Sequence, residues 1–531
     1  MNRRPDSTSI RTLAKEIAEQ EEHFRKGGGA AGHERQKKLG RLSVRDRLKH
    51  LLDSEREFLE VNLWAGFEMY PEAGEIPAAG VVTGVGRVAD RNCMVIANDA
   101  TVKAGAFFPA TVKKVLRAQR IAARCNLPIL YLVDSSGVYL PMQDEIFPDE
   151  DDFGRIFRNN AVMSAMGIPQ IAAVMGSCVA GGAYLPVLCD KILMTEGSEM
   201  DLAGPDLVKA AIGQEVDREQ LGGAEMHARV SGTIDFREKD DVACIHRLRK
   251  LVEFFPSDRA AGSLDHKAAT RANALEELPA DYDAHELLAR VIDLDSMQEY
   301  KGEYGKSLVC AYASIGGRKV GIVASQRASS KTGHGELQIG GVIYHESADK
   351  AARFVMDCNQ STLPIVFFQD VVGFMVGRDS EQHGIIRSGA KLVNAVSNST
   401  VPKVTVIVGG SFGAGNYALC GKAFDPTFIF AWPGAHYAVM GADQAANTLL
   451  AIESRAAERR GKQMTEAELA QMHRQVKERY ERQADIRYAA ARGWIDAIIP
   501  PHRTREVLIQ ALQIATRPGP AGGFRAGVIQ V

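Results

Sequence analysis

The chain has 531 residues, of which 45% are hydrophobic and 24% are charged, and its formal net charge is −2. This length exceeds what one hydrophobic core usually serves, so we expect two or three globular domains. The balanced charge gives no reason to expect nucleic-acid binding, and no apolar run is long enough to cross a bilayer.

Eight scattered cysteines, none of them in a C-x-x-C pair, argue against a zinc ribbon or a disulfide framework. Most of them stand among apolar residues, as reduced thiols in a cytosol do. No H-E-x-x-H motif or Cys/His cluster predicts a metal site. The N-terminal segment lacks the apolar core of a signal peptide, and its acidic residues are not typical of a mitochondrial leader. We therefore predict a bacterial cytoplasmic protein in preference to one of the mitochondrial matrix.

The first half of the chain alternates between predicted helices and strands. Glycines end a helical pattern over residues 8–26, and the basic segment 37–52 predicts a second helix. Valines and glycines over 80–99 predict paired strands. Two further helices are predicted at 109–126 and 153–167. Each leads into an apolar run, ILYLV or PQIAAVM, that ends in small residues, which predicts an α/β layer with parallel strands.

The second half repeats this alternation after a segment, 239–278, that predicts a linker. Helices are predicted at 345–360 and near 381–398, and the apolar runs IVFFQD and KVTVIVGG predict buried strands. Residues 465–492 predict a long charged helix that packs over the sheet or against a neighbouring subunit.

Two stretches of the first half match two stretches of the second half without gaps. PQIAAVMGSCVAGGAY begins at Pro169 and PKVTVIVGGSFGAGNY begins at Pro402. At nearly the same offset, LPILYLVDSSGV from Leu127 pairs with LPIVFFQDVVGF from Leu363. A repeat this long predicts two similar domains rather than a solenoid. We place them at residues 20–265 and 275–515, related by internal duplication.

Each matched stretch ends in a loop of small residues that leads into a helix. Backbone N–H groups at such a turn can point outward, and Gly and Ala let a ligand approach them. The candidate donors are the amides of Gly181 and Gly182 in the first loop and of Ala414 and Gly415 in the second, where Gly413 supplies room. Two amides can hold a thioester oxygen as it becomes an enolate, which is an oxyanion hole. The alternative is that these glycines only permit close packing of strand and helix, but a matched pair of loops favours a matched pair of functions.

Other loop chemistries fit the sequence less well. The spacing of GGSFG around Ser411 is that of a nucleophile elbow, but Cys178 stands at the equivalent position of the first repeat. No histidine and acid that would complete a catalytic triad can be placed. The two glycine patterns of nucleotide-binding loops are absent at the strand–helix junctions.

Longer blocks carry a resemblance to a known family. They are AGGAY at 180–184, LAGPDLVKAAIGQEV at 202–216, GFMVGRDSEQHGIIRSGAKLVNAV at 373–396 and GGSFGAGNYALCGKAFDP at 409–426. These blocks resemble the carboxyltransferase (beta) subunits of biotin-dependent acyl-CoA carboxylases, above all those specific for 3-methylcrotonyl-CoA and geranyl-CoA. The resemblance extends over roughly residues 20–515.

The resemblance implies an α/β fold of two tandem crotonase-like (ClpP/crotonase) domains, assembled as a hexamer. The chain shows no biotin-attachment M-K-M segment and no ATP-binding carboxylase domain. A partner (alpha) subunit is therefore expected to carry the biotin carboxylase and the biotin carrier, to use ATP and bicarbonate, and to form an α6β6 holoenzyme.

The resemblance also assigns residues to the two sides of the reaction. The acyl-CoA enolate would lie at the first loop and the biotin ureido oxygen at the second loop. Expected substrate-binding residues are Ala180, Lys37, Arg41, Arg45, Gly137 and Arg158. Expected biotin-binding residues are Gly413, Phe412, Gly373 and Phe374. His436 and Tyr437 depart from the family pattern near the biotin side.

By this resemblance the chain moves the carboxyl group of carboxybiotin to an acyl-CoA. The favoured substrate is a branched enoyl-CoA such as 3-methylcrotonyl-CoA, which would be carboxylated at its γ carbon. Geranyl-CoA, a propionyl-type acyl-CoA and a biotin-dependent acyl-CoA decarboxylase are alternatives. A crotonase-like hydratase or hydrolase and a non-catalytic scaffold are two further hypotheses from other classes.

Overall fold

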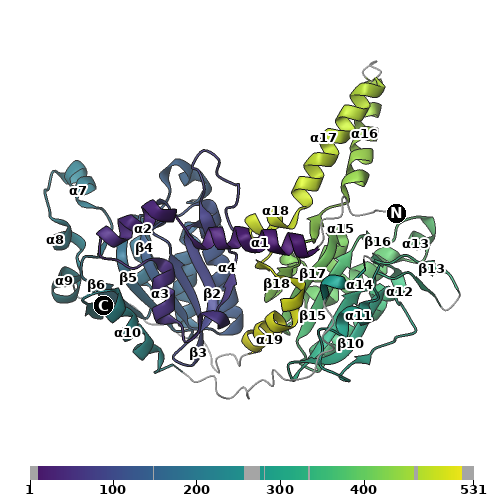
Figure 1. The fold of residues 1–531 in the computed structure, drawn as a ribbon, viewed down its shortest axis with the longest axis horizontal. Helices are drawn as coiled ribbons and strands as arrows, with labels where there is room; N and C mark the ends of the chain where they lie inside the picture. The colour runs from purple at the N-terminus through teal and green to yellow at the C-terminus, as the bar shows by residue number, and fades with distance from the viewer. Residues whose placement is uncertain are drawn as a thin grey trace. The chain divides into compact units, whose positions relative to one another are not determined.

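The computed structural model describes residues 10–147, 149–231, 233–255, 275–279, 281–332, 335–459 and 465–516. The chain divides into two compact units. The N-terminal unit consists mainly of Ala18–Gly262, and the C-terminal unit mainly of Ser263–Ala490 and Trp494–Gln513. Each unit has one eight-stranded sheet with helices packed against it (Figure 1).

The sheet of the N-terminal unit has the strand order β1-β2-β3-β4-β5-β6-β8, and β7 pairs with the end of β5. Its strands are β1 (Leu59–Val61), β2 (Val81–Val88), β3 (Arg91–Asn98), β4 (Ile129–Ser135), β5 (Gln170–Val179), β6 (Lys191–Thr195), β7 (Glu199–Asp201) and β8 (Phe236–Glu238). The first three strands pair antiparallel, and every later pair is parallel. The parallel strands are buried along nearly their whole length, as their continuous apolar runs require.

The helices that accompany this sheet begin and end at recognisable sequence signals. Pro109 opens the helix that runs from Pro109 to Cys125, and Asn126 ends it in the left-handed conformation. The α-helices are α1 (Ile10–Arg25), α2 (Gly29–Lys38), α3 (Val44–Leu51), α4 (Pro109–Cys125), α5 (Phe153–Ala165), α6 (Tyr184–Val187), α7 (Pro205–Ile212), α8 (Arg218–Gly222), α9 (Ala224–Met226) and α10 (Asp241–Val252).

The sheet of the C-terminal unit has the order β20-β18-β17-β15-β11-β10-β9, and β19 pairs with the end of β17. These strands are β9 (Gln298–Glu299), β10 (Leu308–Ile315), β11 (Arg318–Ser325), β15 (Ile365–Val371), β17 (Lys403–Phe412), β18 (Phe428–Ala431), β19 (His436–Ala438) and β20 (Ala497–Ile498). Two small sheets accompany it, formed by β12 (Ser330–Lys331) with β13 (Leu337–Gln338) and by β14 (Val342–Ile343) with β16 (Gly373–Phe374).

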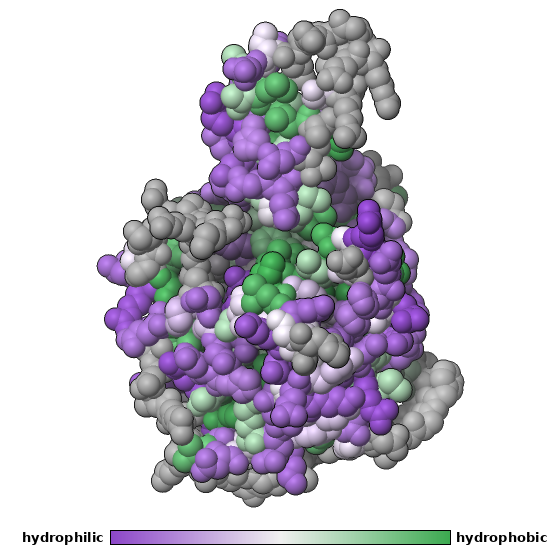
Figure 2. All heavy atoms as spheres, turned by 90° about the vertical axis from the view of Figure 1, so that its right-hand side faces the viewer, coloured by the Kyte–Doolittle hydropathy of each residue, from purple (hydrophilic) through white to green (hydrophobic). Residues whose placement is uncertain are grey.

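The helices of this unit include a long pair that leaves the sheet. The α-helices are α11 (Ala284–Leu288), α12 (His345–Gln360), α13 (Arg378–Gln382), α14 (Ile385–Ser397), α15 (Gly413–Ala418), α16 (Ala442–Arg459), α17 (Glu466–Ala484), α18 (Ile486–Ala491) and α19 (Thr504–Ala515). Helices α16 and α17 lie side by side and extend away from the sheet (Figure 1). Hydrophobic residues reach the surface of this pair among hydrophilic ones, as Figure 2 shows. The long charged helix predicted over 465–492 is α17 followed by α18.

The two sheets share one topology. In the N-terminal unit, the antiparallel hairpin β2–β3 has the short strand β1 on its outer edge and is followed by the parallel strands β4-β5-β6-β8. In the C-terminal unit, the hairpin β10–β11 has the short strand β9 on its outer edge and is followed by the parallel strands β15-β17-β18-β20. In both units a short strand, β7 or β19, pairs with the last residues of the strand that bears the small-residue loop. This agreement is what two related domains would show.

Two predictions about local structure were wrong. The single helix expected over 37–52 is interrupted, because Gly40 has a φ of +69° and the side chain of Ser43 caps a new helix by accepting from the amide of Asp46. The linker expected over 239–278 contains α10, which Asp240 caps and which buries four side chains in the core, namely Cys244, Ile245, Leu248 and Val252. Residues 256–274 of that segment lie outside the described residues.

Candidate active site

The first small-residue loop follows β5 directly. Residues Ala180–Ala183 form a short 3-10 helix that continues into α6. A Cβ atom added at Gly182 would meet no atom within 4 Å. The thiol of Cys178 lies beneath the loop and donates to the carbonyl of Gly182 at 3.5 Å, and its burial raises the pKa of this thiol. The carbonyl group of Gly182 is therefore held by the buried Cys178, and open space lies beside the Cα atom of Gly182.

The second loop follows β17 and is more tightly packed. Gly413 adopts a φ of +52°, which favours glycine. Ala414 is exposed, whereas Gly415 is buried and its added Cβ would lie 2.7 Å from Cγ2 of Val371 and 3.3 Å from Cα of Gly373. Close packing therefore explains Gly415, and Ala414 is the position of the pair that is open to solvent. Phe412 is half-buried beside them.

The structure brings one further glycine to each loop. Gly137, just after β4, has a φ of +89°, and its added Cβ would lie 3.4 Å from the carbonyl oxygen of Val179. Gly373, just after β15, has a φ of +145° and lies against Gly415. Phe374 packs on Gly389 of α14, so its ring faces the core of the C-terminal unit.

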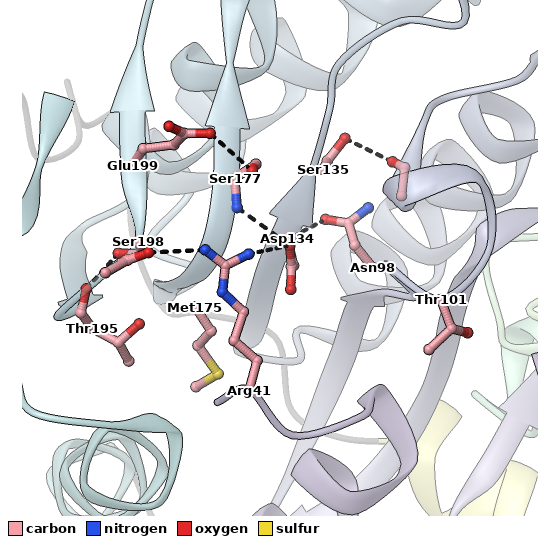
Figure 3. Close-up of polar contacts among 12 residues, drawn as sticks. Arg41, Asn98, Thr101, Asp134, Ser135, Met175, Ser177, Thr195, Ser198 and Glu199 are labelled. Atoms are coloured by element: carbon pink, nitrogen blue, oxygen red, sulfur yellow. Dashed lines mark hydrogen bonds and ion pairs between the residues drawn. The ribbon is translucent and has the colours of Figure 1, made fainter. Parts of the chain in front are cut away.

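A largely buried ion-pair cluster is centred on Asp134, near the ends of β4 and β5 (Figure 3). Asp134, at the end of β4, accepts from the amide of Ser177 through Oδ1 at 3.2 Å. The guanidinium of Arg41 lies 3.7 Å from the same oxygen and donates to the carbonyl of Gly197 at 2.8 Å. Arg47 contacts the other carboxylate oxygen at 3.2 Å. Burial raises the pKa of the Asp134 carboxyl, and Arg47 and Arg41 oppose that rise.

A pocket of about 720 Å³ opens beside this cluster in the N-terminal unit. Four cationic side chains line it, together with the acids Glu34, Glu199 and Glu219 and the small residues Ser177, Gly197 and Ser198. The cations are Arg35, Lys38, Arg41 and Arg218. Such a set of donors fits the phosphates of a nucleotide-like group.

Three of the basic residues expected to bind substrate have different surroundings. Lys37 does not line the pocket, because Glu34, Arg35 and Lys38 share the face of α2 that does. Arg45 donates to the buried carboxylate of Glu60 at 2.7 Å. Arg158 is exposed on α5, one residue after Phe157, whose ring lies 6.2 Å from that of Tyr184 at the first loop. Arg35 precedes the basic segment 37–52, so the missed signal is a first helix that begins at Gly29 and ends at Lys38, with Arg35 and Lys38 on one face.

Ser411 belongs to a buried polar network and is inaccessible. Its hydroxyl donates to Oε1 of Gln369 at 2.6 Å and accepts from Nδ2 of Asn416 at 2.7 Å, and its exposed fraction is 0%. Tyr437 extends this network, since its hydroxyl donates to Oδ1 of Asn416 at 3.4 Å and burial raises its pKa. His436 is exposed on β19. These contacts support the second loop from below and leave no free nucleophile at Ser411.

The described residues offer neither a metal site nor a membrane-spanning helix. No group of three or more His, Cys, Asp or Glu side chains among the described residues could hold a metal ion. In the part of the chain that the structure describes, each helix is too short or too polar to span a bilayer.

Comparison with known proteins identifies the family. The model of the carboxyl transferase domain matches residues 35–518. The chain is 41% identical to a methylcrotonoyl-CoA carboxylase beta chain of Arabidopsis thaliana, with 100% of this chain and 91% of the relative covered. It is 43% identical to the biotin-dependent 3-methylcrotonyl-coenzyme A carboxylase beta1 subunit of Mycobacterium tuberculosis, with 92% and 91% covered.

A solved structure extends this result to the fold. The beta subunit of geranyl-CoA carboxylase from P. aeruginosa aligns with a TM-score of 0.84 at 32% identity, covering 99% of each chain. The family resemblance, the α/β fold class and the enzyme class predicted from the sequence are confirmed. The chain therefore belongs to the carboxyl transferase family.

Proposed function

We propose that this chain is the carboxyltransferase subunit of a biotin-dependent acyl-CoA carboxylase whose substrate is a branched enoyl-CoA such as 3-methylcrotonyl-CoA. The observation that carries this proposal is the full-length similarity, at 41–43% identity, to beta chains named for that substrate. The carboxyl group is added at the γ carbon, because conjugation delivers the resulting charge to the thioester oxygen.

The acyl-CoA side is formed by the first loop and the basic pocket beside it. The CoA phosphates bind Arg35, Lys38, Arg41 and Arg218, whose charges line a space of about 720 Å³. The thioester oxygen binds the amides of Gly181 and Gly182. Support comes from the open space beside Gly182, which leaves room for a ligand atom close to the backbone. Ala180, Gly137 and Arg158 are the other residues assigned to this side.

The biotin side is formed by the second loop. The ureido oxygen of biotin binds the amides of Ala414 and Gly415, and Gly413, Phe412 and Gly373 lie beside it. Phe374 would contribute through its backbone, because its ring packs on Gly389. The exposure of Ala414 supports this assignment, and the positive φ of Gly413 and Gly373 gives a backbone path without protruding side chains.

Catalysis by this chain is mainly electrostatic. Carboxybiotin on the partner subunit supplies the carboxyl group and the base that removes the γ proton. The two loops hold the oxygens on which negative charge develops, and their amide donors are fixed in place before the reaction begins. No side chain of this chain needs to act as general base. The partner (alpha) subunit carries biotin and uses ATP and bicarbonate, and the assembly is an α6β6 complex in the bacterial cytoplasm. The two functional domains extend over 20–265 and 275–515.

The test is bicarbonate fixation by the chain assembled with its biotin-carrying partner. With ATP and radiolabelled bicarbonate, 3-methylcrotonyl-CoA should be the best substrate in a panel that includes geranyl-CoA and propionyl-CoA. No fixation with any thioester would refute the carboxylase function, and turnover without biotin would favour a hydratase or hydrolase. Loss of carboxyl groups without ATP would favour a decarboxylase.

Geranyl-CoA is the second candidate substrate. The structural agreement with the geranyl-CoA carboxylase beta subunit over 99% of both chains favours it. A higher kcat/KM for geranyl-CoA than for 3-methylcrotonyl-CoA in the same panel would decide for it.

A further inference from the structure

A buried aspartate stands at the same place in both units. Asp134 is the penultimate residue of β4, with an exposed fraction of 2%, and Asp370 is the penultimate residue of β15, with 7%. Each carboxylate reaches across to the neighbouring strand that bears the small-residue loop. Asp134 accepts from the amide of Ser177 at 3.2 Å, and Asp370 accepts from the amide of Gly410 at 2.7 Å. Both amides lie three residues before their loops.

The strand pairing explains why a carboxylate is needed there. Between β4 and β5 the register shifts after Val133, and between β15 and β17 it shifts after Gln369. Such an irregularity removes the regular ladder acceptor of a backbone N–H group, and a buried N–H group needs another acceptor. The two aspartates supply it.

An arginine holds each carboxylate in place. Arg47, which is 1% exposed, contacts Oδ2 of Asp134 at 3.2 Å and donates to Asp241 at 2.8 Å. In the other unit Arg327 lies 3.5 Å from Oδ2 of Asp370. Arg41 adds a second cation to Asp134 and also lines the basic pocket.

A glycine makes room for each carboxylate. An added Cβ at Gly176 would stand 2.0 Å from Oδ1 of Asp134, and one at Gly409 would stand 2.2 Å from Oδ1 of Asp370. No other residue fits at either position unless the carboxylate moves. The same arrangement of an aspartate, an arginine, a glycine and a register shift therefore occurs next to both loops.

We propose that Asp134 and Asp370 are positioning residues, each fixing the direction in which one small-residue loop leaves its strand. This inference rests on the proposed function of the loops. Asp134 acts on the acyl-CoA side and Asp370 on the biotin side. Because a displacement of about 1 Å in a catalytic group can cost about 100-fold in rate, loss of either carboxylate should be severe.

The test compares Asp134→Asn and Asp370→Asn with two matched controls. Asp190→Asn removes a carboxylate that accepts from the amide of Gln170, at the opposite end of β5 from the loop. Asp496→Asn removes one that accepts from the amide of Ile429, at the start region of β18. All four variants are assembled with the biotin-carrying partner. The forward reaction gives kcat and KM for 3-methylcrotonyl-CoA, and the reverse transfer to free biotin gives the KM for biotin.

The expected result is specific to one side in each variant. Asp134→Asn lowers kcat/KM for the acyl-CoA by at least about 10-fold and leaves the KM for biotin unchanged, while Asp370→Asn raises the KM for biotin and leaves the KM for the acyl-CoA unchanged. The control variants Asp190→Asn and Asp496→Asn should keep the wild-type values of kcat/KM for the acyl-CoA and of the KM for biotin. Equal losses for both substrates, or losses no greater than those of the controls, would overturn the proposal.

Gly176→Ala and Gly409→Ala provide a second route that keeps every charge. Each added methyl group displaces its carboxylate by steric contact. Gly176→Ala should therefore lower kcat/KM for the acyl-CoA, and Gly409→Ala should raise the KM for biotin. If an aspartate variant fails to fold, the glycine variant of the same unit still tests the proposal. Normal kinetics in Gly176→Ala and Gly409→Ala would also overturn the proposal. Wild-type fixation of bicarbonate on an acyl-CoA tests the proposed function separately, because it does not depend on any variant.

Discussion

Substitution of Gly182 gives the most direct test of the first loop. An added Cβ at this position meets no protein atom within 4 Å, so a larger side chain would extend into open space. Gly182 also has no positive φ, so alanine and valine can adopt its backbone conformation. The volume added at position 182 is therefore taken from a ligand and not from the protein interior.

The magnitude follows from what the loop is expected to do. Removal of one oxyanion-hole donor costs about 100- to 1000-fold in kcat. Gly182→Val should approach that loss, because its branched side chain covers the adjacent amides, and Gly182→Ala should show a smaller loss. The free energy of unfolding should change by only about 0.5 kcal/mol, as for other substitutions that remove no packing.

The assay is bicarbonate fixation on 3-methylcrotonyl-CoA with the partner subunit, together with thermal unfolding of each variant. Gly154→Val is the matched control, since Gly154 on α5 of the same unit also faces open space. The control should keep its activity. If Gly182→Val fixed bicarbonate at the rate of the control, the first loop would not contact the reacting thioester.

Three other substitutions test separate parts of the structure. Arg41→Met should raise the KM for the acyl-CoA by about 10-fold or more, because one charge-assisted phosphate contact is lost. An unchanged KM would exclude the basic pocket as the CoA site. Ser411→Ala should keep most of the carboxylation rate and lower the Tm, because it loses about 1 kcal/mol of buried hydrogen bonding. A fall of about 10,000-fold in the carboxylation rate would instead show that Ser411 is a nucleophile. Lys114→Met should change how stability depends on pH. Burial lowers the pKa of Lys114 to about 7, so between pH about 7 and about 10 the unfolded state binds a proton that the folded state does not. Stability of the wild type relative to Lys114→Met should therefore rise over that range, and parallel Tm profiles would contradict the shift.

The strands that bear the loops could be predicted because their signals are local. β5 and β17 are largely apolar runs that end in small residues, and the neighbouring strands β4 and β15 begin with the apolar runs ILYLV and IVFF, which is how buried parallel strands appear in a sequence. The interruption at Gly40 was also local. Ser43 followed by Asp46 is a helix-start signal, and together with Gly40 it distinguishes two helices from one.

The ion-pair cluster could not be predicted in the same way. Arg47 and Asp134 are 87 residues apart in the chain, and no periodic pattern joins them. The same holds for Arg45, whose partner Glu60 comes from β1 rather than from a ligand. One part of the cluster did have a signal, since Gly176 and Gly409 occupy equivalent positions of the repeat. Identical glycines within two buried strands indicate a close approach at that point.

Val371 explains why the two loops are packed differently although both have the same aspartate, arginine and glycine beside them. Gly182 and Gly415 are equivalent in the repeat, yet only Gly182 faces open space. In the first unit the position of Val371 is taken by Ser135, whose hydroxyl is turned to the carbonyl of Gly105 at 2.7 Å. In the second unit the two methyl groups of Val371 lie 2.7 and 3.0 Å from where a Cβ at position 415 would stand.

This difference predicts a coupled pair of substitutions. Gly415→Ala should destabilise the protein by about 1–3 kcal/mol, because an added methyl group overpacks the contact with Val371. In a Val371→Ser background the same change should cost markedly less, with a coupling of about 1 kcal/mol or more between the two positions. The Tm values of the two single variants and the double variant measure that coupling. Additive effects would mean that Val371 does not fill the space beside Gly415, and the contrast between open space at Gly182 and close packing at Gly415 would then need another cause.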